Sequence, residues 1–444
     1  EQTHALVDGR MLKSSAAHIF RRHPNSALIE PLISGGMDNP VEMAFTPEGE
    51  KFFTSTFLQH PGGGLRDGIA HAVYGGLHGK DHQVIDGHVR TGPLMPIMTQ
   101  LGPAAPSGLI CLKTDHMLGS LDRSAKDRFL SAALFNLHKV TAHRLIPDGA
   151  SFRTDDHDLL VTERVDFHPT DVIEDADGSL LVLDTGGWYD LCCPTSRIDQ
   201  KTAEGGIYRI TSERSRAAAK QTAEIDWASV NAEQAVSLLS DSRPWVGRRA
   251  AEIVVRFADA SVAPLRSTVD DSSRDLDARL TALWTLCQVG TQDAISAAAD
   301  HLNSDELSLV QSACHIVSIH RFQAATSSLV ELLHHPSPQI RRAAAEGLGR
   351  VGDEDSVEGL LDALEESSGD RHLDHSLLYA LVEVTRSDPS IDLRKRAVSD
   401  KRLLAAILTL EQLGRGGELD PPQLFKAAFS QHVPLRRAAI AVLS

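Results

Sequence analysis

A tandem repeat in the second half of the chain is the feature that most restricts its fold. Small and apolar residues recur there at an interval of 31 residues, as Ala282, Ala313, Ala344, Leu302, Leu333 and Leu364. The clearest copy, PSPQIRRAAAEGLGRVGDEDSVEGLLDALEES at 336–367, predicts two amphipathic helices joined by a turn that caps the second helix. One such pair cannot bury its apolar face alone, so the repeats predict a stacked α-solenoid of the HEAT or armadillo type.

The first half of the chain has a different period. Up to about residue 210, short β-branched runs alternate with Gly, Pro, Asp and Asn, which predicts strands and turns. Pro40, Pro106 and Pro169 each open an extended segment, at spacings of 66 and 63 residues. This length is typical of a four-stranded propeller blade, so we expect about three antiparallel blades.

The last copy gives the most detailed prediction, with strands at 170–174, 180–184 and 206–210. Its first turn, EDADG at 174–178, contains acids that suit a calcium loop. Such a loop needs further oxygen ligands at fixed offsets, and the apolar run at 180–183 supplies none. The segment at 39–57 has the same proline-to-glycine spacing without these acids, so we favour a β-hairpin with glycine at positive φ.

The two periods predict a multidomain chain. A partial β-propeller occupies residues 1–212, a linker follows at 213–225, and an all-α solenoid occupies 226–444. A length of 444 residues agrees with more than one hydrophobic core. Because three blades do not close a ring and open sheet edges need partners, we expect further blades, either upstream in a longer precursor or from another chain.

Composition excludes several functional classes. The net charge of -16 and the pI of about 5.7 argue against binding to nucleic acid or to an anionic membrane surface. No apolar run approaches the ~20 residues of a transmembrane helix. The five cysteines have no C-x-x-C spacing, which excludes a zinc ribbon and a covalent haem site. The adjacent Cys192 and Cys193 either pack as small apolar side chains or form a strained vicinal disulfide.

Four segments of the β-rich half carry a resemblance to a known family. They are NPVEMAFTPEGE at 39–50, APSGL at 105–109, FHPTDVIEDADGSLLVLDTGGW at 167–188 and GGIYRI at 205–210, and repeats with IRRAAAEGLGRVGD follow. Nearly the whole chain thereby resembles the exported propeller, HEAT and cytochrome c proteins of planctomycete-type bacteria, which are described as membrane-bound dehydrogenases. Their propeller is similar to the glucose and sorbosone dehydrogenases that use pyrroloquinoline quinone.

The resemblance implies a six-bladed propeller, of which residues 1–212 are the C-terminal part, and oxidation of a sugar or alcohol by a quinoprotein. The parent family would use pyrroloquinoline quinone and calcium and pass electrons to a haem domain. An exported protein, periplasmic or associated with the cell envelope, is also implied. The chain contains no C-x-x-C-H motif, so the haem acceptor is absent from it, and no cofactor motif is evident. The family's catalytic histidine and calcium ligands have no matching motif here and are not carried over.

Blade geometry predicts a rim formed by the loops that enter each inner strand and leave each second strand, where a ligand touches several blades. We take His168 as the catalytic candidate, and the candidates for cofactor binding are Arg90, Asn136, His138, Asp184 and Trp188. His168 is a proton acceptor or metal ligand, or only bonds a loop carbonyl. Asp184 binds a ligand or caps the glycine turn, Trp188 stacks on a sugar or quinone or packs on a blade, and Arg90 clamps an anion or is solvated.

Three functions are compatible with this pattern. The first, favoured by the resemblance, is a fragment of an exported quinoprotein-like oxidoreductase. The second is a non-catalytic propeller and HEAT scaffold that binds a glycan or a protein partner along the rim or the solenoid groove. The third is a calcium-dependent lactonase or hydrolase, which would need several carboxylates in the channel. The sequence contains no nucleophile elbow, no P-loop and no G-x-G-x-x-G that opens a helix.

The paired arginines Arg341 and Arg342 bear on the scaffold hypothesis. Their position on a predicted repeat helix is compatible with binding to a partner. We expect instead that they lie on a solvated face or form ion pairs between repeats.

Overall fold

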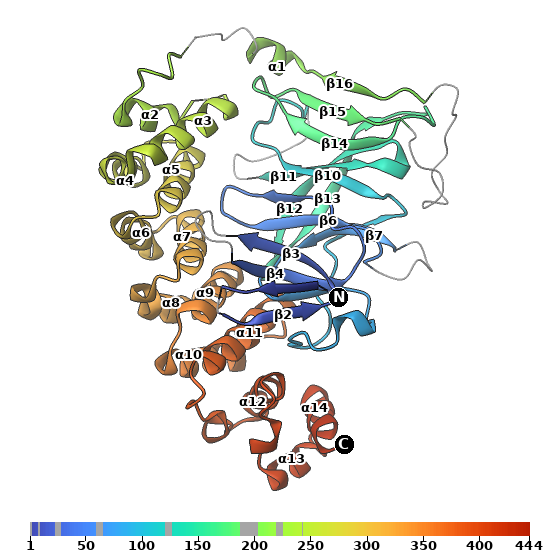
Figure 1. The fold of residues 1–444 in the computed structure, drawn as a ribbon, viewed down its shortest axis with the longest axis vertical. Helices are drawn as coiled ribbons and strands as arrows, with labels where there is room; N and C mark the ends of the chain where they lie inside the picture. The colour runs from blue at the N-terminus through green and yellow to red at the C-terminus, as the bar shows by residue number, and fades with distance from the viewer. Residues whose placement is uncertain are drawn as a thin grey trace.

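The computed structural model describes residues 2–7, 9–22, 28–58, 65–119, 127–186, 203–218, 225–241 and 243–444. It contains two halves that lie side by side, small β-sheets from the N-terminal half and a column of helices from the C-terminal half (Figure 1). The last strand, β16 (Gly206–Ile210), and the first solenoid helix, α2 (Ala232–Leu238), flank the predicted boundary. Within the predicted linker, Glu213–Ala218 form the short helix α1. Cys192 and Cys193 lie outside the described residues.

The described residues of the N-terminal half form five small sheets. Two of them come first: β1 (Gln2–Ala5) with β2 (Met11–Ser14), and β3 (Ala17–Arg22) with β4 (Ile29–Gly36) and β8 (Gly76–Gly79). Three antiparallel sheets follow: β5 (Met43–Phe45), β6 (Lys51–Ser55), β7 (Asp67–His71) and β9 (Thr99–Gly102); β10 (Pro106–Cys111), β11 (Arg128–Leu134), β12 (Lys139–Asp148) and β13 (Ser151–Val161); β14 (Pro169–Glu174), β15 (Leu180–Asp184) and β16.

The three antiparallel sheets open at the repeated prolines, as predicted. Pro106 and Pro169 are the first residues of β10 and β14, and Pro40 precedes β5 by three residues. The strands predicted at 170–174, 180–184 and 206–210 are β14, β15 and β16. Gly49 and Gly178 have φ values of 91° and 72°, which suit the hairpin turns β5–β6 and β14–β15. The hairpin interpretation of EDADG is therefore confirmed.

Two features of the β half depart from the prediction. We expected antiparallel sheets, but β4, which pairs with β3 in antiparallel, pairs with β8 in parallel, so this sheet is mixed. Strand β13 was missed, because its sequence SFRTDDHDLLV is mostly polar and shows little of the apolar alternation of a strand. Among the described strands no sheet closes on itself, so the structure establishes separate antiparallel sheets and does not establish a propeller.

Hydrogen bonds join neighbouring sheets through β6, β10 and β14. The Thr54 hydroxyl of β6 donates to the Ser107 carbonyl of β10 at 2.8 Å, and the Ser107 hydroxyl lies 3.2 Å from the Pro169 carbonyl of β14. Apolar clusters fill the space between the same sheets, one containing Phe52 and Leu109 and the next containing Val172. The three sheets therefore stack in the order of the sequence.

The C-terminal half is an α-solenoid. Its helices after α2 are α3 (Pro244–Val254), α4 (Val262–Asp270), α5 (Leu276–Val289), α6 (Gln292–Ala299), α7 (Leu307–His320), α8 (Thr326–Leu332), α9 (Pro338–Val351), α10 (Glu354–Glu366), α11 (Arg371–Ser387), α12 (Asp400–Gln412), α13 (Pro421–Ala427) and α14 (Val433–Leu443). The described part of the chain also has short 3-10 helices. In the β half these are η1 (Gln83–Ile85) and η2 (Phe135–Leu137). In the solenoid they are η3 (Val255–Ser261), η4 (Asp300–Asn303), η5 (Gln323–Ala325), η6 (Leu393–Arg396) and η7 (Gly416–Glu418).

The 31-residue period corresponds to the packing of this solenoid. Ala282, Ala313 and Ala344 lie on α5, α7 and α9 and are fully buried, and the three repeated leucines are buried as well. Small residues at these positions let consecutive helices approach closely. The turn GDEDS is a helix cap, because the Asp353 side chain accepts from the Ser356 backbone in a capping box. None of the helices in the described segments combines the length and apolarity that a membrane crossing requires.

The β half packs against one face of the solenoid, which we call the inner face and define as α5, α7, α9 and α11 (Figure 1). Each of these helices donates a hydrogen bond to a carbonyl of the β half: Trp284 to Pro47 at 2.8 Å, Ser312 to Glu48 at 3.2 Å, Arg342 to Ala150 at 2.8 Å and His375 to Tyr74 at 2.9 Å. The surface that a solenoid usually offers to a partner is thus covered by the chain's own sheets.

Candidate functional site

The structure brings four of the six predicted site residues together at one end of the last two sheets. Asn136 lies in η2, His138 follows it with φ 52°, His168 precedes β14, and Asp184 ends β15. The rings of His138 and His168 are 4.9 Å apart, and His138 Nδ1 lies 2.7 Å from the Phe167 carbonyl. These four residues therefore lie at the same end of the last two sheets.

Their contacts are mainly internal to the fold. One carboxylate oxygen of Asp184 accepts from the backbone N–H groups of His168 at 2.8 Å and Gly186 at 2.9 Å, so Asp184 holds the loop and caps the glycine turn. The Asn136 amide donates to the Pro103 carbonyl at 3.3 Å. The His168 side chain is fully buried, and burial together with the His138 ring lowers its pKa. The His168 ring is consequently packed inside this end of the sheets.

The other two predicted residues lie elsewhere. Arg90 follows η1; its guanidinium contacts the exposed carboxylate of Asp81 at 2.6 Å, and its backbone N–H donates to Gln412 of α12 at 2.9 Å. Trp188 lies outside the described residues. In the described part of the chain, no group of three or more His, Cys, Asp or Glu side chains is arranged to hold a metal ion.

A buried charge network occupies the centre of the junction between the halves. Glu50 of the β half is 1% exposed and pairs with Arg342 of α9, which is 0% exposed and also contacts Glu346 at 2.6 Å. His71 Nε2 lies 2.7 Å from Glu50 and His71 Nδ1 lies 2.9 Å from the Ser151 hydroxyl. Although burial opposes ionisation, Arg342 and His71 hold the pKa of Glu50 well below its usual range.

This network corrects the expectation for Arg342. The sequence favoured a solvated arginine or an ion pair between repeats, whereas Arg342 is among the largest fully buried side chains and binds the β half. The side chain of Arg341, the preceding residue on α9, makes no hydrogen bond or ion pair with any described side chain. The prediction was wrong for Arg342 because its partner Glu50 is 292 positions away and leaves no local signal.

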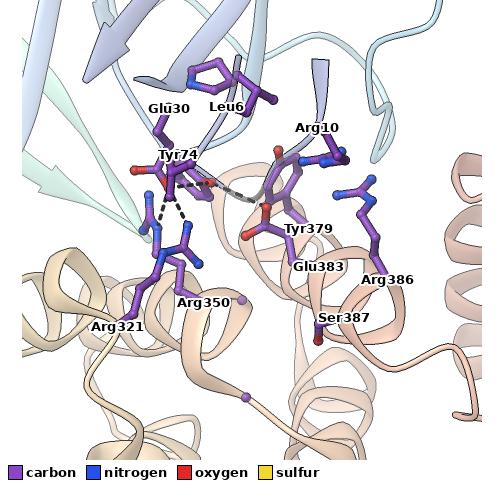
Figure 2. Close-up of a pocket in the computed structure, with 14 residues that line it drawn as sticks. Leu6, Arg10, Glu30, Tyr74, Arg321, Arg350, Tyr379, Glu383, Arg386 and Ser387 are labelled. Atoms are coloured by element: carbon purple, nitrogen blue, oxygen red, sulfur yellow. Dashed lines mark hydrogen bonds and ion pairs between the residues drawn. The ribbon is translucent and has the colours of Figure 1, made fainter. Parts of the chain in front are cut away.

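Beside this network, a cavity of about 400 Å³ opens between the halves. Figure 2 shows its lining side chains, which come from the β1–β2 connection, β4 and the loop after β7 in the β half, and from the C-terminal parts of α7, α9 and α11 in the solenoid. Its charged and aromatic residues are Arg10, Glu30, Tyr74, Arg321, Arg350, Tyr379, Glu383 and Arg386. We call this space the junction cavity. Its volume is in the range of small-molecule sites.

One side of the junction cavity is organised around Glu30, as the dashed lines of Figure 2 show. Arg350 donates to Glu30 Oε1 at 3.1 Å, and Arg321 reaches the same oxygen at 3.1 Å. The guanidinium of Arg350 also stacks on the Tyr74 ring at 3.4 Å from its centroid, a cation–π contact. Burial alone would favour protonation, but Arg350 and Arg21 lower the pKa of Glu30 to about 2.

The opposite side of the junction cavity is formed by α11. Tyr379, Glu383 and Arg386 are spaced by four and three residues, which places them on one helical face. Burial raises the pKa of Glu383 to about 7, against the lowering effect of Arg350. The Tyr74 hydroxyl lies 3.4 Å from Glu383 and so links the two sides. The cavity therefore offers cations, hydroxyls and a carboxyl that titrates near neutrality.

Sequence analysis did not find the junction cavity. A weak signal exists, because Arg321, Arg350 and Arg386 end the inner-face helices α7, α9 and α11. A cation at a helix C-terminus complements the helix dipole, so each arginine alone is unremarkable. Only the stacking of the repeats shows that the three converge on one space.

Comparison with known proteins supports the solenoid. The HEAT-repeat family matches residues 313–377, from α7 to α11, which confirms HEAT-type repeats in this part of the chain. No curated protein sequence matches the chain.

Solved structures show distant likeness. The CpcE–CpcF complex of phycocyanin lyase from Nostoc is 18% identical, with coverage of 50% of this chain and 90% of that chain and a TM-score of 0.30. A designed armadillo repeat protein is 14% identical, with coverage of 48% and 98% and a TM-score of 0.27. An oxidoreductase of the glucose dehydrogenase type from Thermus thermophilus is 18% identical, with coverage of 41% and 46% and a TM-score of 0.28. Values this low carry no argument about function, and the resemblance to planctomycete dehydrogenases stays a prediction.

Proposed function

We propose that this chain is a non-catalytic binding scaffold in which the solenoid braces the β half and the junction cavity holds a small polar ligand, such as a unit of a glycan. The observation that carries this proposal is the arrangement of the cavity. It lies where the two halves meet, and both halves contribute polar side chains to it. Ligand sites commonly form at such boundaries between domains.

The chemistry of the cavity supports binding over catalysis. Tyr74, Glu30 and Arg350 are occupied by one another, and burial raises the pKa of Tyr74 well above its usual range, so its hydroxyl stays protonated. No described side chain that lines the cavity is a cysteine or a histidine. The only described hydroxyl there apart from the two tyrosines is Ser387, which donates no proton to a base within the cavity.

Ligand-detected NMR with a panel of neutral and acidic sugars tests this proposal. Ser387 is an exposed residue at the cavity wall, and Ser387→Trp places an indole in the ligand space without disturbing the core. Ser390→Trp, at an exposed serine three positions further on that does not line the cavity, is the matched control. We expect at least one sugar to bind wild type and Ser390→Trp and to lose binding to Ser387→Trp. Binding that survives in both variants, or no binding by the folded protein, would refute the proposal.

We further propose that the sheets of the β half are blades of a propeller. Support comes from the order of the three antiparallel sheets and from the bonds that join them, Thr54 of β6 to Ser107 of β10 and Ser107 to Pro169 of β14. Such bonds near one axis are what blades sharing a channel require. Electron microscopy of a longer form of the protein would test this arrangement, and an open stack of sheets would contradict it.

A second candidate function is the exported quinoprotein-like oxidoreductase of the resemblance. The observation that favours it is the clustering of Asn136, His138, His168 and Asp184 at one end of two sheets. Tests need the protein supplied with pyrroloquinoline quinone and calcium, a sugar panel and a dye acceptor. Dye reduction that is lost in His138→Ala would support this function. If neither cofactor absorbance nor turnover is observed, the oxidoreductase function is refuted. The exported location, which rests on the same resemblance, then has no support.

A further inference from the structure

The junction cavity is rich in positive charge on a chain that is otherwise acidic. The whole sequence has 44 Lys and Arg against 60 Asp and Glu, whereas the residues lining the cavity include four arginines and two glutamates. Three of these arginines end successive inner-face helices, α7, α9 and α11. The repeat architecture thus concentrates cations where the protein as a whole does not.

Protein carboxylates do not balance this charge. Glu30 is one carboxylate, and it accepts from three guanidinium groups, those of Arg21, Arg321 and Arg350. Burial raises the pKa of Glu383 to about 7, so this second carboxyl is only partly ionised near neutrality. An excess of positive charge therefore remains in a partly desolvated space, where electrostatic interactions are stronger than in water.

Two arginine groups of the cavity lack full pairing. The side chain of Arg350 is 2% exposed, yet its Nη2 atom has no hydrogen-bond partner among the described residues. Buried donors of this kind are seldom left without an acceptor. The Arg386 side chain lines the cavity and makes no hydrogen bond or ion pair with any described side chain, although its charge acts on Tyr379 and Glu383.

Resting on the proposed function of the cavity, we propose that its ligand carries a carboxylate, which Arg386 binds beside the tyrosines while Arg350 adds positive charge from the opposite side. A guanidinium presents parallel donors that match the two oxygens of a carboxylate. The shared chemistry is a small carboxylic acid, and its source is either an acidic sugar or a simple organic acid. The cavity volume of about 400 Å³ accommodates a single sugar ring.

Helix capping alone does not explain these arginines. A cation at a helix C-terminus gains its stabilisation at the surface, with its remaining donors in water. Arg350 instead is buried, and desolvation of a guanidinium is costly unless its donors are paired. Because Nη2 itself is enclosed by the protein, Arg350 contributes its charge to the cavity, and Arg386 provides the donors that a ligand can reach.

Calorimetric titration separates the alternatives. The probes are galacturonate, galactose as its neutral counterpart, succinate as a simple acid, and inorganic phosphate. The variants are Arg386→Met, which removes a cation that holds no protein partner, and Arg341→Met, a matched change on α9 outside the cavity. Arg386→Lys tests whether the fork of donors, and not only the charge, is needed. Circular dichroism verifies that each variant is folded.

We expect wild type and Arg341→Met to bind galacturonate at least about tenfold more tightly than galactose, because a charge-assisted pair is added. Arg386→Met loses about tenfold in affinity for galacturonate and little for galactose, and Arg386→Lys recovers part of the loss. Succinate that binds as tightly as galacturonate supports the carboxylate and identifies the source as an organic acid.

Other results overturn the inference. Equal affinity for galactose and galacturonate, with both lost in Ser387→Trp, refutes the carboxylate and leaves the proposed binding function intact. Phosphate that binds more tightly than both acids refutes the carboxylate in favour of a different anion. No binding of any probe by the folded protein refutes the inference, and with a negative wider sugar panel it refutes the proposed function too.

Discussion

Replacement of Arg342 by alanine is expected to weaken the junction between the two halves more than any surface substitution. Arg342 is fully buried, pairs with Glu50, contacts Glu346 at 2.6 Å and donates to the Ala150 carbonyl at 2.8 Å. Arg342→Ala leaves two buried carboxylates. The nearest remaining cation is Lys51, 3.8 Å from Glu346.

The size of the effect follows from these contacts. Breaking a buried ion pair by removal of one partner costs roughly 3–5 kcal/mol, because the other charge stays buried without compensation. Arg342 pairs with two carboxylates, which increases the free-energy cost of its removal. Lys51 remains near Glu346 and reduces this cost in part. We expect a loss of about 4 kcal/mol in the free energy of unfolding.

The loss should depend on pH. Burial opposes ionisation of Glu346, but Lys51 and Arg342 lower its pKa to about 2, from 4.5 in the unfolded chain. A carboxyl with a lowered folded-state pKa stabilises the protein above the unfolded pKa, and this stabilisation is lost as pH falls toward the folded value. The difference between wild type and Arg342→Ala is therefore largest above about pH 5 and shrinks between pH 4.5 and 2.

Urea unfolding followed by circular dichroism measures this loss, and hydrogen exchange of β6 and α9 reports opening of the junction. Arg341→Ala is the matched control, because it removes the same side chain from the neighbouring position, and we expect a change below about 1 kcal/mol. If Arg342→Ala and Arg341→Ala unfold at the same urea concentration and exchange equally, the network does not hold the halves together.

Three further substitutions test other parts of the structure. Glu383→Gln should stabilise the protein by up to roughly 3 kcal/mol above pH 7 and by nothing below pH 4.5, since the folded pKa of Glu383 is raised from 4.5 to about 7; equal unfolding midpoints at pH 8 would contradict this. Gly75→Ala should lower the melting temperature, because Gly75 has φ 73° and a Cβ there would lie 2.4 Å from the Tyr379 ring; Gly87→Ala, at φ 80° with no neighbour within 4 Å, isolates the backbone part. Arg128→Met should cost about 1–2 kcal/mol in urea unfolding, because the Arg128 guanidinium bridges the β half to α5, and an unchanged midpoint would refute that bridge.

Local patterns in the sequence predicted most of the secondary structure. The period of Ala282, Ala313 and Ala344 predicted the solenoid. Each repeat contacts mainly its neighbours, so the residues that determine the packing lie close together in the sequence. Strands β14 to β16 followed from proline, glycine and apolar alternation. Strand β13 did not, because its partner β12 supplies the hydrogen bonds while its own side chains are largely polar.

The candidate sites were less predictable, because their contacts join distant segments. His138, His168 and Asp184 lie near predicted strand ends. Because equivalent ends of neighbouring sheets meet, the strand positions were enough to predict that the three residues lie near one another. The burial of His168 depends on loops around it that no period encodes. Glu50 and Arg342 are 292 positions apart, and each by itself is an ordinary polar residue in its segment.

The location of the buried charges determines which surfaces remain open to a protein partner. HEAT-type solenoids usually bind partners along one face, and here the inner face is closed by hydrogen bonds from Trp284, Ser312, Arg342 and His375 to the β half. A partner that competed for this face would have to expose Glu50 and Arg342, at a cost of several kcal/mol. Partner binding through the solenoid is therefore expected on the outer helices α4, α6, α8 and α10 or on α12 to α14, and the inner face serves to position the junction cavity (Figure 1).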